Sequence, residues 1–274
     1  MKNELGFYDG IKNWDFSMIK YIEENLTDWD LYRILNDCTS PNSKILDLGT
    51  GGGEKVLRNF PIVKEIIATD FSKEMINTAN KNLAKTERKD ITFKQMDNLN
   101  ITTPDNYFDI VVARHTCIDA KGIYKTLKIG GKLLLRGVDK LDCWQLKKLY
   151  GKGQAFKDEK PISLRDYEDI LDAGFKKVEL VPIHIREYYK TKEDLLALLL
   201  KTPILSEFSE TEENKYEDNE KINMNLLDKY IEENTSEKGI LLIRRYYGIT
   251  AVKYYKLQNC NQKILHSALD IVHQ

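Results

Sequence analysis

The sequence predicts an α/β protein built on a doubly wound, seven-stranded and mostly parallel sheet. Three observations predict this fold. Short apolar segments alternate with helical ones from residue 44 onward, as in strand–helix–strand units. Each short segment is nearly all apolar, which is expected of strands that helices cover on both faces. Four glycines within residues 49–53 follow the first of these segments, where a strand turns tightly into a helix.

Local patterns place each element along the chain. Apolar residues at three- to four-residue spacing predict a helix over 15–36. Ser72 and Ser163 each precede a further periodic segment, as helix N-caps do. Two shorter helices are expected over 54–59 and 118–126. The seven strands are expected over 44–48, 65–69, 91–95, 108–113, 132–138, 178–188 and 239–253.

The bulk composition excludes several classes of protein. A chain of 274 residues that is 42% hydrophobic can bury a sizeable core. Its formal net charge of -1 gives no overall field that would attract nucleic acid. The four cysteines form no C-x-x-C pair, so neither a metal site nor a disulfide framework is expected. No apolar segment suits a signal peptide or a membrane span, so we expect a cytoplasmic protein without a membrane partner.

The glycine turn, DLGTGGGE, admits several ligands. A phosphate loop would end in Gly-Lys-Ser or Gly-Lys-Thr, but here Gly53 precedes Glu54-Lys55-Val56. A dinucleotide turn would place pyrophosphate at the helix N-terminus, where the Glu54 carboxylate would repel it. A phosphate-free nucleoside with a cationic group suits the acidic Asp47 before the turn. A turn without any ligand is disfavoured by so many glycines at one place.

Residues 45–138 resemble the class I S-adenosylmethionine-dependent methyltransferases of small molecules, which have a Rossmann-like fold. The segment Asp47–Gly53 matches their first motif, D-x-G-x-G-x-G. Asp70 ends the second strand, as does the acidic residue that holds the ribose hydroxyls in that family. LKIGGKLLL resembles their L-k-p-G-G-x-l-l motif, with Ile129 in place of the usual proline. The resemblance implies an enzyme that takes a methyl group from S-adenosyl-L-methionine.

The same resemblance implies a set of cofactor contacts. The Asp70 carboxylate would bind the ribose diol with two acceptor oxygens, Phe71 would pack on adenine, and Asp97 would accept from the adenine amino group. The full set of expected cofactor-binding residues is Asp47, Gly49, Thr50, Gly51, Gly53, Asp70, Phe71, Met75, Met96, Asp97, Asn98 and Arg114.

Few residues are needed for the chemistry of methyl transfer, because the donor is already activated. His115 follows the fourth strand and is the candidate general base or substrate hydrogen-bond partner. A structural histidine lining the cofactor pocket is the alternative. Asp119 would either orient His115 or cap the next helix. The candidates for acceptor binding are His115 and four aromatic residues, Tyr8, Trp14, Trp144 and Tyr188.

The expected organisation has five segments: an N-terminal helical lid (1–40), a Rossmann-like cofactor-binding core (41–189), an inserted helical lobe shaping the acceptor pocket (190–238), the last strand of the sheet (239–255) and a tail (256–274). The expected function is methyl transfer to a small-molecule acceptor. The alternatives are an RNA or protein methyltransferase anchored by Arg244 and Arg245, a non-catalytic cofactor-binding or scaffold protein, and an NAD-dependent oxidoreductase. Arg-His-Thr-Cys replaces the N-P-P-Y motif of base-methylating enzymes, which disfavours nucleic acid as a partner. The sequence leaves the acceptor atom and the oligomeric state open.

Overall fold

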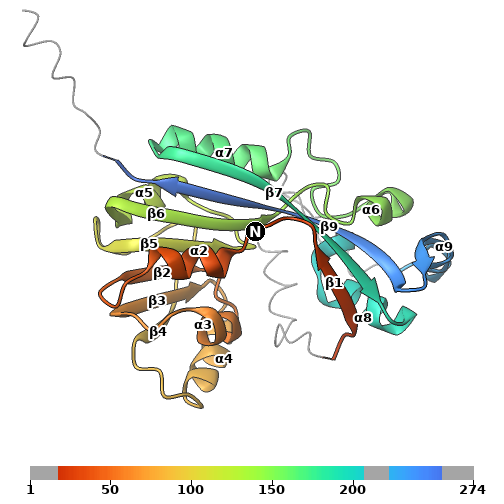
Figure 1. Ribbon diagram of the computed structural model, residues 1–274, viewed down its shortest axis with the longest axis horizontal. Coiled ribbons are helices and arrows are strands. Elements are labelled where there is room, and N and C mark those ends of the chain that lie inside the picture. Colours follow the sequence, from red (N-terminus) through yellow and green to blue (C-terminus); the bar gives the residue numbers. More distant parts are fainter. Residues whose placement is uncertain (1–17, 207–221, 255–274) are drawn as a thin grey trace, which may run out of the picture.

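The computed structural model describes residues 18–206 and 222–254 (Figure 1). In these residues nine strands form one mixed sheet in the order β1-β7-β9-β6-β5-β2-β3-β4, with the short β8 paired to β9. The strands are β1 (Tyr21–Asn25), β2 (Lys44–Leu48), β3 (Glu65–Asp70), β4 (Ile91–Gln95), β5 (Phe108–Arg114), β6 (Leu127–Val138), β7 (Lys176–Tyr189), β8 (Thr235–Ser236) and β9 (Gly239–Val252).

The expected parallel core is confirmed. Strands β4, β3, β2, β5 and β6 run parallel to one another. Strand β9 lies antiparallel between β6 and β7. Strands β3 and β4 lie on one side of β2, and β5 and β6 lie on the other, because the chain crosses over β2 after β4. The direction in which strands are added to the sheet therefore reverses at β2. Ligands of such sheets bind outside the carboxyl ends of the strands at this reversal.

Helices cover both faces of the sheet. On one face lie α2 (Leu31–Cys38), α3 (Glu54–Asn59) and α4 (Lys73–Leu83), and α4 packs on β3 and β4. On the other face, α5 (Ala120–Thr126) packs on β6, and α7 (Ile162–Ala173) packs on β6, β7 and β9. The central strands β2, β3, β5 and β6 therefore bury apolar side chains on both sides, which explains their nearly continuous apolar segments.

A third core lies where β7 and β9 extend beyond the parallel strands (Figure 1). It is built by α6 (Trp144–Tyr150), α8 (Lys192–Lys201), the 3-10 helix η1 (Pro203–Leu205) and α9 (Met224–Asn234) against the ends of these two strands. Between β7 and β9 the described residues form α8, η1, α9 and the short β8. None of the described helices is long and apolar enough to cross a membrane.

The helix expected over 15–36 is wrong for its middle part. Residues 21–25 form β1, whose backbone pairs with the end of β7, from Tyr21 opposite Tyr189 to Asn25 opposite Ile185. Ile22 and Leu26, which produced the helical spacing, are 42% and 55% exposed and so form no buried stripe. Helix α2 begins only after Asp30, whose side chain accepts the backbone N–H of Arg33 at 2.7 Å. Residues 1–17 of the predicted lid, with Tyr8 and Trp14, lie outside the described residues.

The loop before α2 packs closely on the sheet at Gly248 in β9. A Cβ atom on Gly248 would lie 2.4 Å from Cε2 of Trp29, whose indole is buried over the strand. We expect Gly248→Ala to lower the free energy of unfolding by about 1–3 kcal/mol, because the indole must be displaced. Urea unfolding measures the change. A double-mutant cycle with Trp29→Leu is the control: if Gly248→Ala costs the same without the indole, this contact is not the cause.

Candidate active site

The glycine turn joins β2 to α3 with backbone angles that favour glycine. Gly49, Gly51 and Gly53 have φ angles of 77°, 58° and 80°. A Cβ atom on Gly49 would lie 2.9 Å from Cβ of Thr116, and one on Gly53 would lie 2.6 Å from Cζ of Phe93. The turn is therefore pressed against the end of β5 and against β4, and the glycines are needed for this close approach.

Asp47 and Arg114 form a buried ion pair beneath this turn. Arg114 Nη2 lies 3.5 Å from Asp47 Oδ2, and the Asp47 side chain has no exposed surface. Burial raises the pKa of Asp47, and the Arg114 guanidinium opposes this effect; the nearby Thr50 hydroxyl opposes it too, without the geometry of a hydrogen bond. Burial alone would lower the pKa of Arg114, but Asp47 and the Tyr32 hydroxyl raise it. Each ion of the pair thus favours the charged form of the other and opposes the effect of burial.

Three polar atoms around this pair lack a hydrogen-bond partner in the part of the chain that the structure describes. They are Asp47 Oδ1, Thr50 Oγ1 and Arg114 Nε, and all three are buried. Buried polar atoms without a partner are rare and costly, and these belong to residues of one small region. A carboxylate oxygen accepts from a cation and a guanidinium N–H donates to an anion. The region thus suits a ligand that carries an ammonium group and a carboxylate.

Asp70 lies at the carboxyl end of β3, next to the glycine turn. Its Oδ2 accepts the backbone N–H of Gly51 at 2.8 Å, and its Oδ1 accepts that of Ser72 at 2.9 Å. Burial raises the pKa of Asp70, and these backbone N–H groups oppose the rise. The carboxylate is thereby fixed in orientation, and each oxygen retains a lone pair for a hydroxyl group. Phe71, directly beside it, is 40% exposed and offers an apolar ring.

The other expected cofactor residues are distributed around the ends of β4 and β5. Met75 and Met96 are buried, so little of either side chain is available to a ligand. Asp97 Oδ1 accepts the backbone N–H of Leu99 at 2.9 Å. Asn98 Nδ2 donates to Thr116 Oγ1 at 2.9 Å and so joins the loops that follow β4 and β5.

His115 follows β5 with a φ of 51°, in the left-handed region. Its Nε2 lies 3.3 Å from Nη1 of Arg136, and its ring meets the Tyr246 ring edge-on at 5.5 Å between centroids. The residue keeps exposed surface, yet the surrounding protein lowers its pKa well below the usual value. Burial is the largest cause, and four cations, Arg136 foremost, lower it further. His115 is therefore neutral at pH 7, and its Nε2 lone pair accepts from Arg136.

The structure does not bring every acceptor-binding candidate to this region. The Trp144 ring packs on Phe156, with 5.2 Å between centroids. The Tyr188 hydroxyl donates to Glu24 Oε2 at 3.1 Å, at the end of the sheet that carries β1. Asp119 Oδ1 accepts the backbone N–H of Gly122 at 3.0 Å, so Asp119 is the N-cap of α5, as one of its two interpretations expected.

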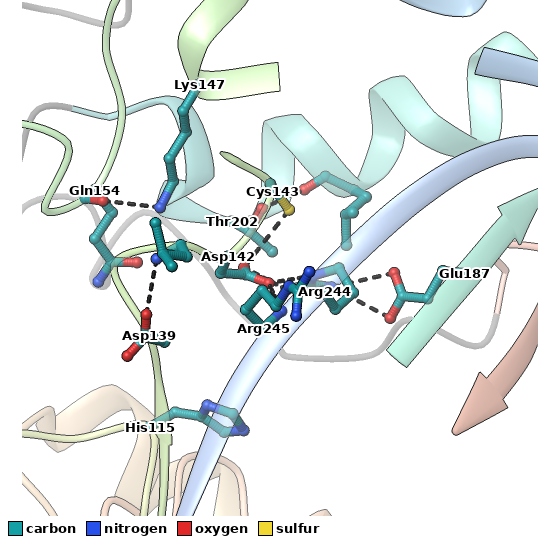
Figure 2. A network of polar contacts seen from close by, with 12 residues as sticks. His115, Asp139, Asp142, Cys143, Lys147, Gln154, Glu187, Thr202, Arg244 and Arg245 are labelled. Carbon is teal, nitrogen blue, oxygen red and sulfur yellow. Dashed lines mark hydrogen bonds and ion pairs between the residues drawn. The ribbon is translucent and has the colours of Figure 1, made fainter. Parts of the chain in front are cut away.

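Arg244 is not a surface anchor, contrary to the role considered for it in nucleic acid or protein binding. Its side chain is buried between Asp142, with contacts of 3.0 and 3.1 Å, and Glu187, with contacts of 3.2 and 3.3 Å (Figure 2). Arg245 Nη1 contacts His184 Nδ1 at 2.6 Å. The physical reason is that an alternating strand directs one of two successive arginines into the protein, where it needs carboxylate partners.

Sequence reasoning did not identify Thr116, Arg136 or Tyr32 as part of this region. Tyr32 Oη accepts from Arg114 Nη1 at 3.4 Å, and the Arg136 guanidinium lies 4.3 Å above the Tyr246 ring. A signal for Arg136 exists in the sequence: it is a charged residue inside the otherwise apolar strand segment LLLRGV. Such a residue in a buried strand calls for a functional or ionic partner.

Part of the sequence is similar to known methyltransferases. A family model described as a methyltransferase domain matches residues 39–171. The chain is 28% identical over 91 residues to an uncharacterised methyltransferase, YcgJ of Bacillus subtilis, covering 33% of this chain and 36% of that protein. It is 31% identical over 112 residues to the ribosomal protein L11 methyltransferase of Listeria welshimeri, covering 39% and 35%. The chain thus covers little more than a third of these relatives.

Two solved structures share the fold. The structure of YcgJ superimposes with a TM-score of 0.52 at 18% identity, over 82% of this chain and 98% of that one. BH2331 of Bacillus halodurans, provisionally assigned as a methyltransferase, superimposes with a TM-score of 0.56 at 18% identity, over 82% and 99%. Residues 39–171 thus match a methyltransferase-domain model, and the chain shares the fold of these two structures.

The residues of this site fit S-adenosylmethionine, the cofactor that the resemblance implies. The methionine part of S-adenosylmethionine carries an ammonium group and a carboxylate, which suit Asp47 Oδ1 on one side and Arg114 Nε and Thr50 Oγ1 on the other. The glycine turn leaves no side chain in the way, and Asp70 is oriented for a diol. Among the described residues, no three His, Cys, Asp or Glu side chains form a metal-binding group.

Proposed function

We propose that this protein transfers a methyl group from S-adenosylmethionine to a small-molecule acceptor. The observation that supports it best is the trio of buried, unpartnered atoms of Asp47, Thr50 and Arg114 beside the glycine turn. Buried polar atoms without a partner are costly unless a ligand with complementary charges satisfies them. A dinucleotide would instead bring phosphate charge to Glu54, the first residue of α3.

The residues would act by binding and orienting. When bound, S-adenosylmethionine supplies a sulfonium-activated methyl group, which a nucleophile takes in line while the sulfur keeps the electron pair. Asp47 and Arg114 would hold the amino-acid end of the cofactor, and Asp70 would hold the ribose with charge-assisted hydrogen bonds. Phe71 would cover the adenine ring. These contacts fix the direction in which the methyl group faces the acceptor, which is the main requirement of the reaction.

His115 is better suited to hydrogen bonding than to proton abstraction. Its pKa lies well below the usual value, and its Nε2 already accepts from Arg136 at 3.3 Å. A base with a low pKa and an occupied lone pair removes a proton poorly. We therefore propose His115 as a substrate hydrogen-bond partner, with the proton on Nδ1 as the tautomer that the Arg136 contact favours.

Calorimetry with three ligands tests the cofactor. We expect S-adenosylmethionine and S-adenosylhomocysteine to bind and NAD to give no heat. Binding of NAD alone would overturn the proposal in favour of an oxidoreductase. Turnover is tested by the appearance of S-adenosylhomocysteine when the protein and S-adenosylmethionine are incubated with a metabolite extract of low molecular mass. Cofactor binding without turnover in any extract would favour the non-catalytic alternative.

A protein acceptor is the second candidate, because relatives of similar sequence are named for ribosomal protein L11. The buried Arg244 no longer supports a macromolecular anchor. Turnover that is stimulated by a protein or RNA fraction and not by small metabolites would favour this candidate.

The low pKa of His115 predicts a pH effect on stability. The unfolded chain binds a proton at His115 below pH 6.5, whereas the folded protein does so only at much lower pH, so stability falls as pH falls through 6.5. We expect the loss of unfolding free energy from pH 7 to pH 5 to be smaller in His115→Asn than in the wild type. Asparagine tolerates the left-handed backbone at this position. Urea unfolding at both pH values measures it, and equal losses would contradict a lowered pKa of His115 in the folded protein.

A further inference from the structure

Among the described residues, Arg136, next to the proposed cofactor site, faces no carboxylate. Arg136 on β6 is the Cα partner of Arg114 on β5, at the carboxyl ends of both strands. Residues paired in register on neighbouring parallel strands point to the same face, about 5 Å apart. Arg136 therefore stands one strand beyond the Asp47–Arg114 pair, on the same face of the sheet.

The contacts of Arg136 are with neutral groups. Its guanidinium lies over the Tyr246 ring at 4.3 Å, and Nη1 lies 3.3 Å from His115 Nε2. Within residues 18–206 and 222–254, no carboxylate lies within 4 Å of it, in contrast to Arg114 with Asp47 and Arg244 with Asp142 and Glu187. Tyr246 and His115 thus fix the plane of the guanidinium and leave most of its five N–H donors for another partner.

The electrostatic surroundings of Arg136 are positive. Lys55, on α3, has its pKa lowered by burial first and then by Arg114, Arg58 and Arg136. The acidic groups that act on this region are Glu23, Asp47, Asp70, Asp142 and Glu187. Asp47 pairs with Arg114, and Asp142 and Glu187 pair with Arg244. Among the described residues, Arg136, Lys55 and Arg58 form no ion pair, and the protonated Nδ1 of His115 adds a further donor beside Arg136.

We propose that the methyl acceptor carries a carboxylate or phosphate group, and that Arg136 binds this group as the specificity-determining residue. A planar guanidinium held by stacking binds such a group with two parallel N–H···O bonds. The inference rests on the proposed methyl transfer, because it assigns Arg136 to the acceptor and Arg114 to the cofactor. Arg136 would hold the acceptor by its anionic group, and the Nδ1–H of His115 would donate to the same molecule.

The test uses four probes of similar shape with the full-length protein. Benzoate and phenyl phosphate represent the two anions, and benzamide and benzyl alcohol are neutral. Each is titrated by calorimetry with and without a saturating concentration of S-adenosylhomocysteine. We expect at least one anion to bind and both neutral probes to bind at least about tenfold more weakly. The anion that binds with the higher affinity indicates whether the acceptor carries a carboxylate or a phosphate.

Two variants test whether the anionic probes bind at Arg136. We expect Arg136→Gln to weaken anion binding by about 10- to 100-fold while the affinity for S-adenosylhomocysteine is unchanged. Arg186→Gln is the matched control, because Arg186 is an exposed arginine on β7, and it should change neither affinity. If no anion binds, or if Arg136→Gln has no effect on anion binding, the inference is wrong. If S-adenosylhomocysteine fails to bind the wild type, the proposed function fails, and the anion titrations without it still decide the role of Arg136.

Discussion

Arg244→Met is expected to lower the free energy of unfolding at pH 7 by about 3–5 kcal/mol, because it leaves two buried carboxylates without their cation. Asp142 and Glu187 are almost fully buried on either side of Arg244. The Tyr189 hydroxyl donates to Glu187 at 2.5 Å and the backbone N–H of Arg245 donates to Asp142 at 2.8 Å. These neutral contacts remain in the variant, but they do not replace a positive charge. Urea unfolding gives the change directly.

Removal of the two carboxylates separates lost charge from lost packing. Adding Asp142→Asn and Glu187→Gln to Arg244→Met should recover part of the loss at pH 7. Arg186→Met, at an exposed position, should change stability by less than about 0.5 kcal/mol. A loss that is the same with and without the two carboxylates would mean that packing alone is responsible.

Asp70→Ala is expected to weaken the binding of S-adenosylhomocysteine by about 30- to 150-fold, or about 2–3 kcal/mol. The reason is the loss of two charge-assisted hydrogen bonds from an oriented carboxylate to the ribose diol. The backbone N–H groups of Gly51 and Ser72 would also lose their acceptor, which loosens the glycine turn. Calorimetry measures the affinity. The substitution should lower the affinity for 2′-deoxyadenosine compounds less than the affinity for the ribose compounds.

Asp90→Ala provides the control for this prediction. Asp90 directly precedes β4, at the amino ends of the parallel strands, whereas Asp70 lies at their carboxyl ends. Like Asp70 it accepts a backbone N–H, from Val63 at 3.2 Å, and it also pairs with Arg88 at 2.8 Å. Its removal should lower stability and leave the affinity for S-adenosylhomocysteine unchanged. Equal losses of affinity in both variants would mean that Asp70 acts through folding stability.

The parallel core was predictable because its signals are local. Each strand from β2 to β6 is a short apolar segment followed by a turn residue, and Gly49–Gly53 mark a turn that few other residues can form. Strand β1 was not predictable, because its conformation depends on hydrogen bonds to residues 185–189. The helical spacing of Ile19, Ile22 and Leu26 gave the wrong answer, because a non-local pairing overrides local preference.

The site was predictable to the extent that it follows the glycine turn and the strand ends. Asp47, Asp70 and Arg114 stand next to sequence features that fix their place. Arg244 was misinterpreted because its partners lie 102 and 57 residues away in the sequence. Nothing local distinguishes an arginine that binds buried carboxylates from one that faces solvent. The neutral state of His115 has the same origin, because Arg136 and Tyr246 reach it only in the folded sheet.

The position of β9 between β6 and β7 also bears on synthesis by the ribosome. The sheet cannot close until residues 239–252 are made, because β6 and β7 each pair with β9 and not with one another. At about 5–20 residues per second, the 50 residues from Tyr189 to Gly239 take about 3–10 s to synthesise. During this interval β6 and β7 have unpaired edges, which are sites for mispairing with other chains. A nascent chain of this protein is thus expected to depend on chaperones most strongly just before its last strand emerges.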